Sequence, residues 1–168
     1  MKKFKLLFLV ALIAFSSCSS NDDSETTPGV QEIKATIDLN ALSNLSGNDA
    51  TSLITFNGVP AAQHLTEALV GDEILYIIDT DDASTVIRYT EYNYASGDDN
   101  LWGSLESVHD GTGWLVGLKV SEGAELENEV KFDMQFQLEV NGVLQTNKTY
   151  LIDPKIKIRA KRSSNNVR

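Results

Sequence analysis

The chain has 168 residues, a formal charge of −10 and a single cysteine. Its acidic balance argues against a nucleic-acid partner, because phosphates require a cationic surface. One cysteine excludes an intramolecular disulfide framework, and a domain of about 130 residues can bury a core without one.

Residues 1–17 have the pattern of an export signal. Three lysines within the first five residues precede a continuous apolar stretch, residues 6–15. As a helix this stretch reaches about 15 Å, half of the roughly 30 Å hydrocarbon core, which suits a signal peptide and is too short to span. The following Ser16-Ser17-Cys18 resembles the lipobox of bacterial lipoproteins, with Phe15 where that family usually has leucine. The resemblance implies that Cys18 is acylated and anchors the mature protein to a membrane. An ordinary secretory signal or an N-terminal membrane helix is the alternative.

Residues 18–30 are predicted to form a flexible tether, because small, polar and acidic residues bury too little apolar surface to order a chain. Asp22 and Asp23 resemble the acidic signal that sends lipoproteins of Bacteroidota-type bacteria to the cell surface. The resemblance implies an outer-membrane lipoprotein exposed on the cell. A periplasm-facing protein with a plain solvated linker is the alternative. At the other end of the chain, residues 161–168 are predicted to form a basic flexible tail.

Between these segments, residues 31–160 are predicted to form one β-sandwich domain. In the clearest strand, 130–140, apolar residues alternate with polar ones, so that one face meets a core and the other meets water. Asn57-Gly58 and Asn141-Gly142 are residue pairs typical of two-residue hairpin turns. The pattern predicts an all-β fold, a single antiparallel sandwich of about seven to eight strands. The predicted strands are 33–39, 52–56, 73–78, 85–94, 113–120, 130–140, 143–152 and 155–160, the last at a sheet edge, with a short helix over 61–69.

Two short motifs resemble the inclusion-body (AidA/PixA-type) family of bacterial proteins. They are Val70-Gly71-Asp72-Glu73-Ile74, which opens a strand, and Asp153-Pro154-Lys155-Ile156-Lys157-Ile158 near the end of the chain. Ile152 stands where an aromatic residue is expected before the second motif. The resemblance implies a β-sandwich and ligand or glycan binding, and it implies no catalytic residues.

Carboxylates in predicted loops are the candidate metal ligands. Asp79, Asp81 and Asp82 supply the hard oxygen atoms that calcium prefers, although Ala83 and the lack of a glycine depart from the EF-hand pattern. Solubility of an acidic turn is the alternative explanation. Calcium is therefore the one candidate cofactor, and the sequence requires none.

The two histidines do not match a catalytic or zinc motif. His109, next to Asp110 and near Ser104 and Ser107, is not accompanied by a nucleophile elbow, and residues adjacent on a strand point to opposite faces. His64 and His109 are too far apart in sequence to form a recognisable zinc pair. We therefore expect a protein without enzymatic activity.

A segment with aromatic and polar side chains is the candidate ligand site. Aromatic faces can stack on a sugar ring while carboxylates and amides bond its hydroxyls; burial in the core is the alternative, and it is what we expect for Trp114. The candidate residues are Trp102, Tyr92, Tyr94, Asp98, Asp99 and Asn100.

The expected function is that of a membrane-anchored, surface-exposed, non-enzymatic module that binds a glycan or polymer. A structural or accessory lipoprotein of an envelope assembly and a calcium-stabilised adhesion module are the alternatives.

Overall fold

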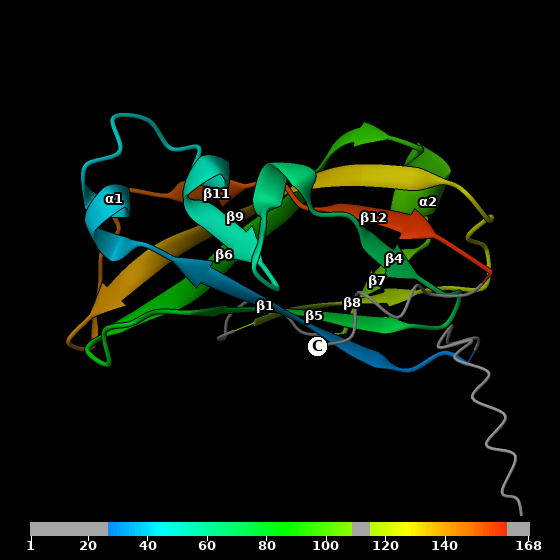
Figure 1. Cartoon of the computed structure of the whole chain (residues 1–168), viewed down its shortest axis with the longest axis horizontal. Coiled ribbons are helices and arrows are strands. Elements are labelled where there is room, and N and C mark those ends of the chain that lie inside the picture. Colours follow the sequence, from blue (N-terminus) through cyan, green and yellow to red (C-terminus); the bar gives the residue numbers. More distant parts are fainter. Residues whose placement is uncertain (1–26, 109–114, 161–168) are drawn as a thin grey trace, which may run out of the picture.

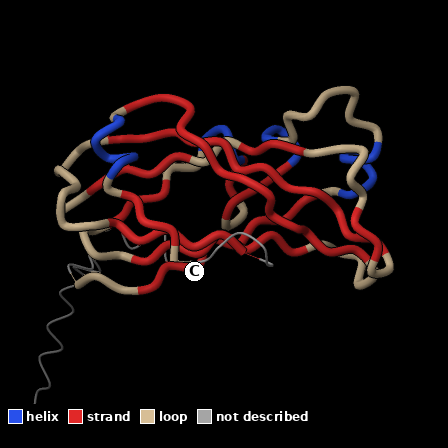
Figure 2. Tube along the Cα trace, turned by 180° about the vertical axis from the view of Figure 1, so that it is seen from behind, coloured by secondary structure: helices blue, strands red, loops and turns tan. Residues whose placement is uncertain are grey.

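The structure is a computed structural model that describes residues 27–108 and 115–160. The leader, the tail 161–168 and several residues named above lie outside the described residues, namely Cys18, Asp22, Asp23, His109, Asp110 and Trp114. Within the described residues, strands build two sheets that lie across each other, and the short helices lie outside them (Figures 1 and 2). The predicted all-β fold is confirmed.

The first sheet contains six strands in the order β3-β2-β1-β5-β8-β7. Its long central pair carries the alternation that the sequence shows, since every second residue of β1 and β5 is buried. The bounds are β1 (Val30–Ile37), β2 (Ile54–Phe56), β3 (Val59–Pro60), β5 (Glu73–Asp79), β7 (Leu105–Ser107) and β8 (Leu115–Val120).

The second sheet is organised around one long strand, β9 (Glu129–Val140). On one side β9 pairs with β6 (Thr85–Gly97) along most of its length. On the other side it pairs in succession with β10 (Val143–Leu144), β11 (Tyr150–Ile152) and β12 (Lys155–Ile158), and β4 (Thr66–Ala68) lies beyond β12. The helical segments are α1 (Leu39–Ser43), α2 (Asp99–Gly103) and the 3-10 turns η1 (Thr51–Leu53) and η2 (Ala61–Gln63).

The core lies between the two sheets and is built by the period-two faces. On β9 every second residue from Val130 to Phe136 is fully buried, and Ile33, Ile74 and Tyr76 face them from the first sheet. Alternation in sequence therefore translates directly into one dry face and one wet face per strand. Among the described residues, no helix is long and apolar enough to cross a membrane.

Two strand pairs are parallel, which the purely antiparallel prediction did not include. β1 pairs with β5 in parallel, and β12 pairs with β4 in parallel. Parallel neighbours need a long crossover, and the chain supplies one between residues 37 and 73 and another between residues 68 and 155. Strand periodicity specifies faces but not partners, so the direction of pairing was not readable from it.

The segment 61–69 is a second correction, because it forms η2 and β4 instead of one helix. Thr66 and Ala68 point into the core while Glu67 lies between them, a pattern of period two. β4 covers β12, so β12 lies inside the sheet and is not the predicted edge strand. The predicted strand 143–152 is interrupted between residues 145 and 149 and divides into β10 and β11. Both predicted Asn-Gly turns are confirmed by positive φ angles at both residues of each pair.

The Gly-Asp motif before β5 fixes the start of the sandwich. The Asp72 side chain is fully buried and accepts hydrogen bonds from the Gly29 amide at 2.8 Å, the Gln31 Nε2 at 2.7 Å and the Leu69 amide at 2.7 Å. Gly71 adopts φ +90°, a conformation that few other residues tolerate. The motif thus ties the first residues of β1 to the end of β4.

Candidate functional site

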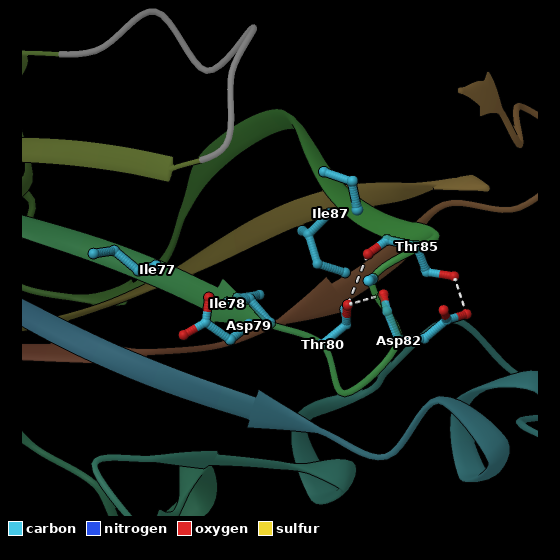
Figure 3. Close-up of a pocket in the computed structure, with 9 residues that line it drawn as sticks. Ile77, Ile78, Asp79, Thr80, Asp82, Thr85 and Ile87 are labelled. Atoms are coloured by element: carbon cyan, nitrogen blue, oxygen red, sulfur yellow. Dashed lines mark hydrogen bonds between the residues drawn. The ribbon is translucent and has the colours of Figure 1, made fainter. Parts of the chain in front are cut away.

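The turn between β5 and β6 lies at the end of the long axis opposite to residue 27 (Figure 1). Asp82 holds this turn together by accepting bonds from the Ser84 amide (2.9 Å), the Ser84 hydroxyl (2.8 Å) and the Thr85 hydroxyl (2.9 Å). Thr80 Oγ1 donates to the backbone oxygens of Asp82 (3.0 Å) and Thr85 (2.7 Å), as Figure 3 shows. The bonds from Ser84 and Thr85 lower the pKa of Asp82. Asp82 is therefore a turn-forming residue.

Two open pockets adjoin this turn, and we call them together the acidic end. The first lies between β5 and β6, has a volume of about 230 Å³ and is floored by Ile77, Ile78 and Ile87 (Figure 3). The second has a volume of about 660 Å³ and lies between the ends of β1 and β5 and the start of α1. Asp79 and Thr80 line both.

The lining of the acidic end is polar at its rim and bears one sign of charge. The second pocket is lined by threonine hydroxyls, an asparagine amide and three carboxylates, and none of its lining residues is basic. The polar lining residues are Thr36, Asp38, Asn40, Thr55, Asp79, Thr80 and Asp81. Such a surface repels anions and suits a cation or a neutral hydroxylated ligand, because carboxylates accept hydrogen bonds from hydroxyls.

The three aspartates predicted as calcium ligands lie in one turn but do not gather around a point. In the part of the chain that the structure describes, no group of three or more histidine, cysteine, aspartate or glutamate residues is arranged to hold a metal ion. Asp82 is engaged in the turn. Asp38, the further carboxylate in the lining of the second pocket, caps α1 by accepting from the Asn40 and Ala41 amides at 2.9 and 3.0 Å. Asp79 and Asp81 are exposed.

The structure also separates the candidate calcium ligands from the carboxylates of the candidate sugar site. Asp82 precedes β6 and Asp98 follows it, and β6 has 13 residues. At 3.3 Å per residue these two ends are about 40 Å apart. The two loops therefore cannot contribute to a single site.

The predicted aromatic residues, by contrast, do come together. Trp102 on α2 lies against Tyr92 and Tyr94 of β6, with ring centroids 5.9 and 6.2 Å apart, and against the buried Phe132 of β9 at 5.8 Å. Trp102 is half-buried, while Tyr94 is 41% exposed and donates its hydroxyl to the Gly97 carbonyl. Packing on Phe132 gives Trp102 a structural role whether or not its outer edge contacts a ligand.

Among the polar residues near Trp102, one caps a helix and two are exposed to solvent. Asp98 caps α2 by accepting from the Asn100 amide at 2.8 Å and the Leu101 amide at 3.3 Å. Asp99 and Asn100 are exposed. Of the predicted sugar-binding set, these two side chains and the exposed part of Tyr94 are open to a ligand.

His64 is a core residue. It is 5% exposed, its ring lies 5.3 Å from that of Phe56, and its Nε2 lies 3.2 Å from the Thr66 hydroxyl, which in turn contacts the Tyr76 hydroxyl at 3.1 Å. Burial lowers the pKa of His64. The side chain is therefore one member of a buried chain of hydrogen bonds that continues through Thr66 to Tyr76.

Sequence reasoning missed the contribution of β1 to the acidic end. The parallel register places Thr36 beside Asp79, so Asp38 and Asn40 arrive next to the β5–β6 turn. These residues come close to the turn because β1 and β5, which are 43 residues apart in sequence, pair with each other. The alternation of side chains within one strand does not predict such a pairing.

Comparison with known proteins supports the fold. No protein-family model and no curated protein matches the sequence. Among solved structures, the fold is similar to that of the inclusion body protein PixA from Burkholderia cenocepacia, with a TM-score of 0.54 and 12% sequence identity. The similarity covers 80% of this chain and 97% of that one. At this identity the likeness concerns the fold alone, and it agrees with the resemblance seen in the two short motifs.

Proposed function

We propose that the chain is a membrane-anchored, surface-exposed lipoprotein whose β-sandwich is a non-enzymatic ligand-binding module, and that its acidic end contacts the ligand. The observation that best supports this proposal is the position of the acidic end, far from residue 27, where the chain continues toward Cys18 (Figure 1). The tether thus joins the domain at the end opposite to Asp79 and Asp81, both of which are exposed.

The ligand class follows from the lining of the two pockets. Threonine hydroxyls, an asparagine amide and carboxylates, without a basic side chain among them, favour a neutral polymer rich in hydroxyl groups, such as a glycan. Negatively charged polymers are disfavoured by the same carboxylates.

Membrane anchoring is tested by labelling cells with a radioactive fatty acid. The wild-type protein is expected to incorporate label and the Cys18→Ser variant is not; an unlabelled wild type would refute the anchor. Protease shaving of intact cells, with an Asp22→Ala/Asp23→Ala variant as comparison, tests exposure on the surface. Degradation of the wild type together with protection of the variant is the expected result, and protection of both would place the domain on the periplasmic side.

Ligand contact is tested by retention on immobilised neutral polysaccharides. We expect Asp79→Asn/Asp81→Asn to change retention, and Glu122→Gln/Glu125→Gln, which removes the same charge from an exposed turn elsewhere, to leave it unchanged. Equal behaviour of the two variants would show that the acidic end is not the contact.

A calcium-stabilised adhesion module is the second candidate, and it rests on Asp79 and Asp81. Neither carboxylate makes an ion pair or hydrogen bond to another described residue, so both are open to a cation assisted by backbone and water oxygens. On this reading calcium raises Tm in the wild type and not in Asp79→Asn/Asp81→Asn. A Tm that is the same with calcium and with chelator would exclude it.

A further inference from the structure

A third polar pocket lies on the outer face of the β9 sheet, and we call it the charged pocket. Its volume is about 310 Å³, at the lower end of the range for small-ligand sites. It shares no lining residue with the acidic end. It is lined by Asp49, Thr51, Ser52, Ala62, Lys131, Asp153 and Lys155.

Four separate segments build this pocket, residues 49–52, 62, 131 and 153–155. The loop before η1 lies along β11, because the Ala50 amide donates to the Leu151 carbonyl and the Leu151 amide donates to the Asn48 carbonyl, both at 2.8 Å. These bonds set Asp49 over the sheet. Beneath it, β9 and β12 place Lys131 directly opposite Lys155, with both side chains on the outer face. The walls are therefore held by backbone hydrogen bonds rather than by mobile side chains.

A buried hydroxyl in the wall is left without a partner. Thr51 is 7% exposed, and its Oγ1 makes no hydrogen bond of normal geometry within the described part of the chain. The hydroxyl and the backbone amide of Thr51 lie near enough to Asp49 to lower the pKa of that carboxyl, and the amide donates to Oδ1 at 2.9 Å. The Oγ1 atom itself has almost no surface open to solvent. A ligand in the pocket would therefore meet the exposed Ser52 hydroxyl of the same turn rather than Thr51 Oγ1.

The charges around the pocket are of both signs. Lys131 forms an ion pair with Asp153, whereas Lys155 has no ion pair with another described residue. Burial, and secondly the negative charge of Asp153, raises the pKa of the neighbouring Asp133. The pocket therefore offers an ammonium donor, carboxylate acceptors and the exposed hydroxyl of Ser52 within one small space.

We infer that the charged pocket binds one sugar-sized polyol unit. A hydroxyl group both donates and accepts, so vicinal hydroxyls can bond Lys155, Asp49 and Ser52 at once. A simple anion would meet the carboxylates, and an apolar group would leave the polar lining unpaired. This second site extends the proposed function and stands independently of the acidic end.

The test is an amide chemical-shift titration of the full-length protein in detergent with methyl glucoside, N-acetylglucosamine and inositol as probes. We expect at least one probe to give saturable shifts in residues 49–52, 62, 131 and 155. Lys155→Gln is expected to weaken this binding at least fivefold. The matched control is Lys157→Gln, two residues along the same strand, where the ammonium pairs with Glu127 instead; it should bind like the wild type.

Ser52→Ala provides a second readout. Because this hydroxyl is exposed, the variant should keep the Tm of the wild type while binding the polyol more weakly. The absence of saturable shifts with all three probes, or shifts that persist unchanged in both Lys155→Gln and Ser52→Ala, would overturn the inference. Loss of polysaccharide retention in Asp79→Asn/Asp81→Asn with intact polyol shifts would separate the two sites.

Discussion

Replacing Asp72 with alanine tests whether one buried carboxylate secures the start of the sandwich. The side chain accepts from the Gly29 amide, the Gln31 side chain and the Leu69 amide, and two of these donors are themselves buried. A hydrogen bond to a charged group contributes about 1.5–3 kcal/mol, and Gly29 is exposed enough to turn to water. Loss of the two buried bonds should therefore cost about 3–6 kcal/mol, a large part of the roughly 5–15 kcal/mol that stabilises a domain.

Urea unfolding followed by circular dichroism measures this cost directly. Asp72→Asn should lose less, about 1–2 kcal/mol, because its one carbonyl oxygen can still accept from Gln31 and Leu69. Asp38→Ala is the matched control: it removes an exposed cap of α1 and should cost about 1 kcal/mol. An Asp72→Ala protein as stable as Asp38→Ala would refute the role assigned to the buried carboxylate.

Three further predictions concern other elements. Because burial lowers the pKa of His64, its contribution to stability should be complete above about pH 6.5 and should fall as the pH drops from there toward the folded-state pKa, by at most about 1.4 kcal/mol per pH unit. In unfolding measured against pH, His64→Gln should flatten this slope, and an unchanged slope would contradict the reasoning. Gly97→Ala should lower the unfolding free energy by more than about 2 kcal/mol, because the φ of Gly97 is +103° and an added Cβ would lie 2.4 Å from a β9 carbonyl oxygen. Gly58→Ala is the control: its φ is +80° but the space around it is open, so it should cost only about 1 kcal/mol. Equal losses of the two variants in urea titrations would contradict this. Trp102→Ala should cost about 2–4 kcal/mol in the same assay because the indole packs on the core, and an unchanged midpoint would mean that the ring does not contribute to packing.

Some features of the fold were readable because they depend on neighbours in sequence. The alternation from Val130 to Phe136 predicts a buried face, and the structure buries every one of those alternate residues. The Asn57-Gly58 and Asn141-Gly142 pairs likewise predict the turns that form, since positive φ is a property of the two residues themselves.

The candidate site was readable only in its parts. The sequence identified Asp79 and Asp81 as carboxylates in a turn, and Tyr92, Tyr94 and Trp102 as an aromatic group that does assemble. The sequence analysis did not identify Asp82 as a turn-forming residue, although the hydrogen bonds that engage its carboxylate are local and come from residues two and three positions later.

Sequence by itself determined the all-β class, the faces of the long strands, the acidic surface and the expectation of an N-terminal lipid anchor. The tertiary structure alone decided that β1 runs parallel to β5, that β4 covers β12 and that the two carboxylate loops lie at opposite ends of β6. It also brought Asp49 and Thr51 against Lys131 and Lys155. The reason is physical: side-chain periodicity along a strand is local, whereas the choice of partner strand depends on how two sheets bury their apolar faces together.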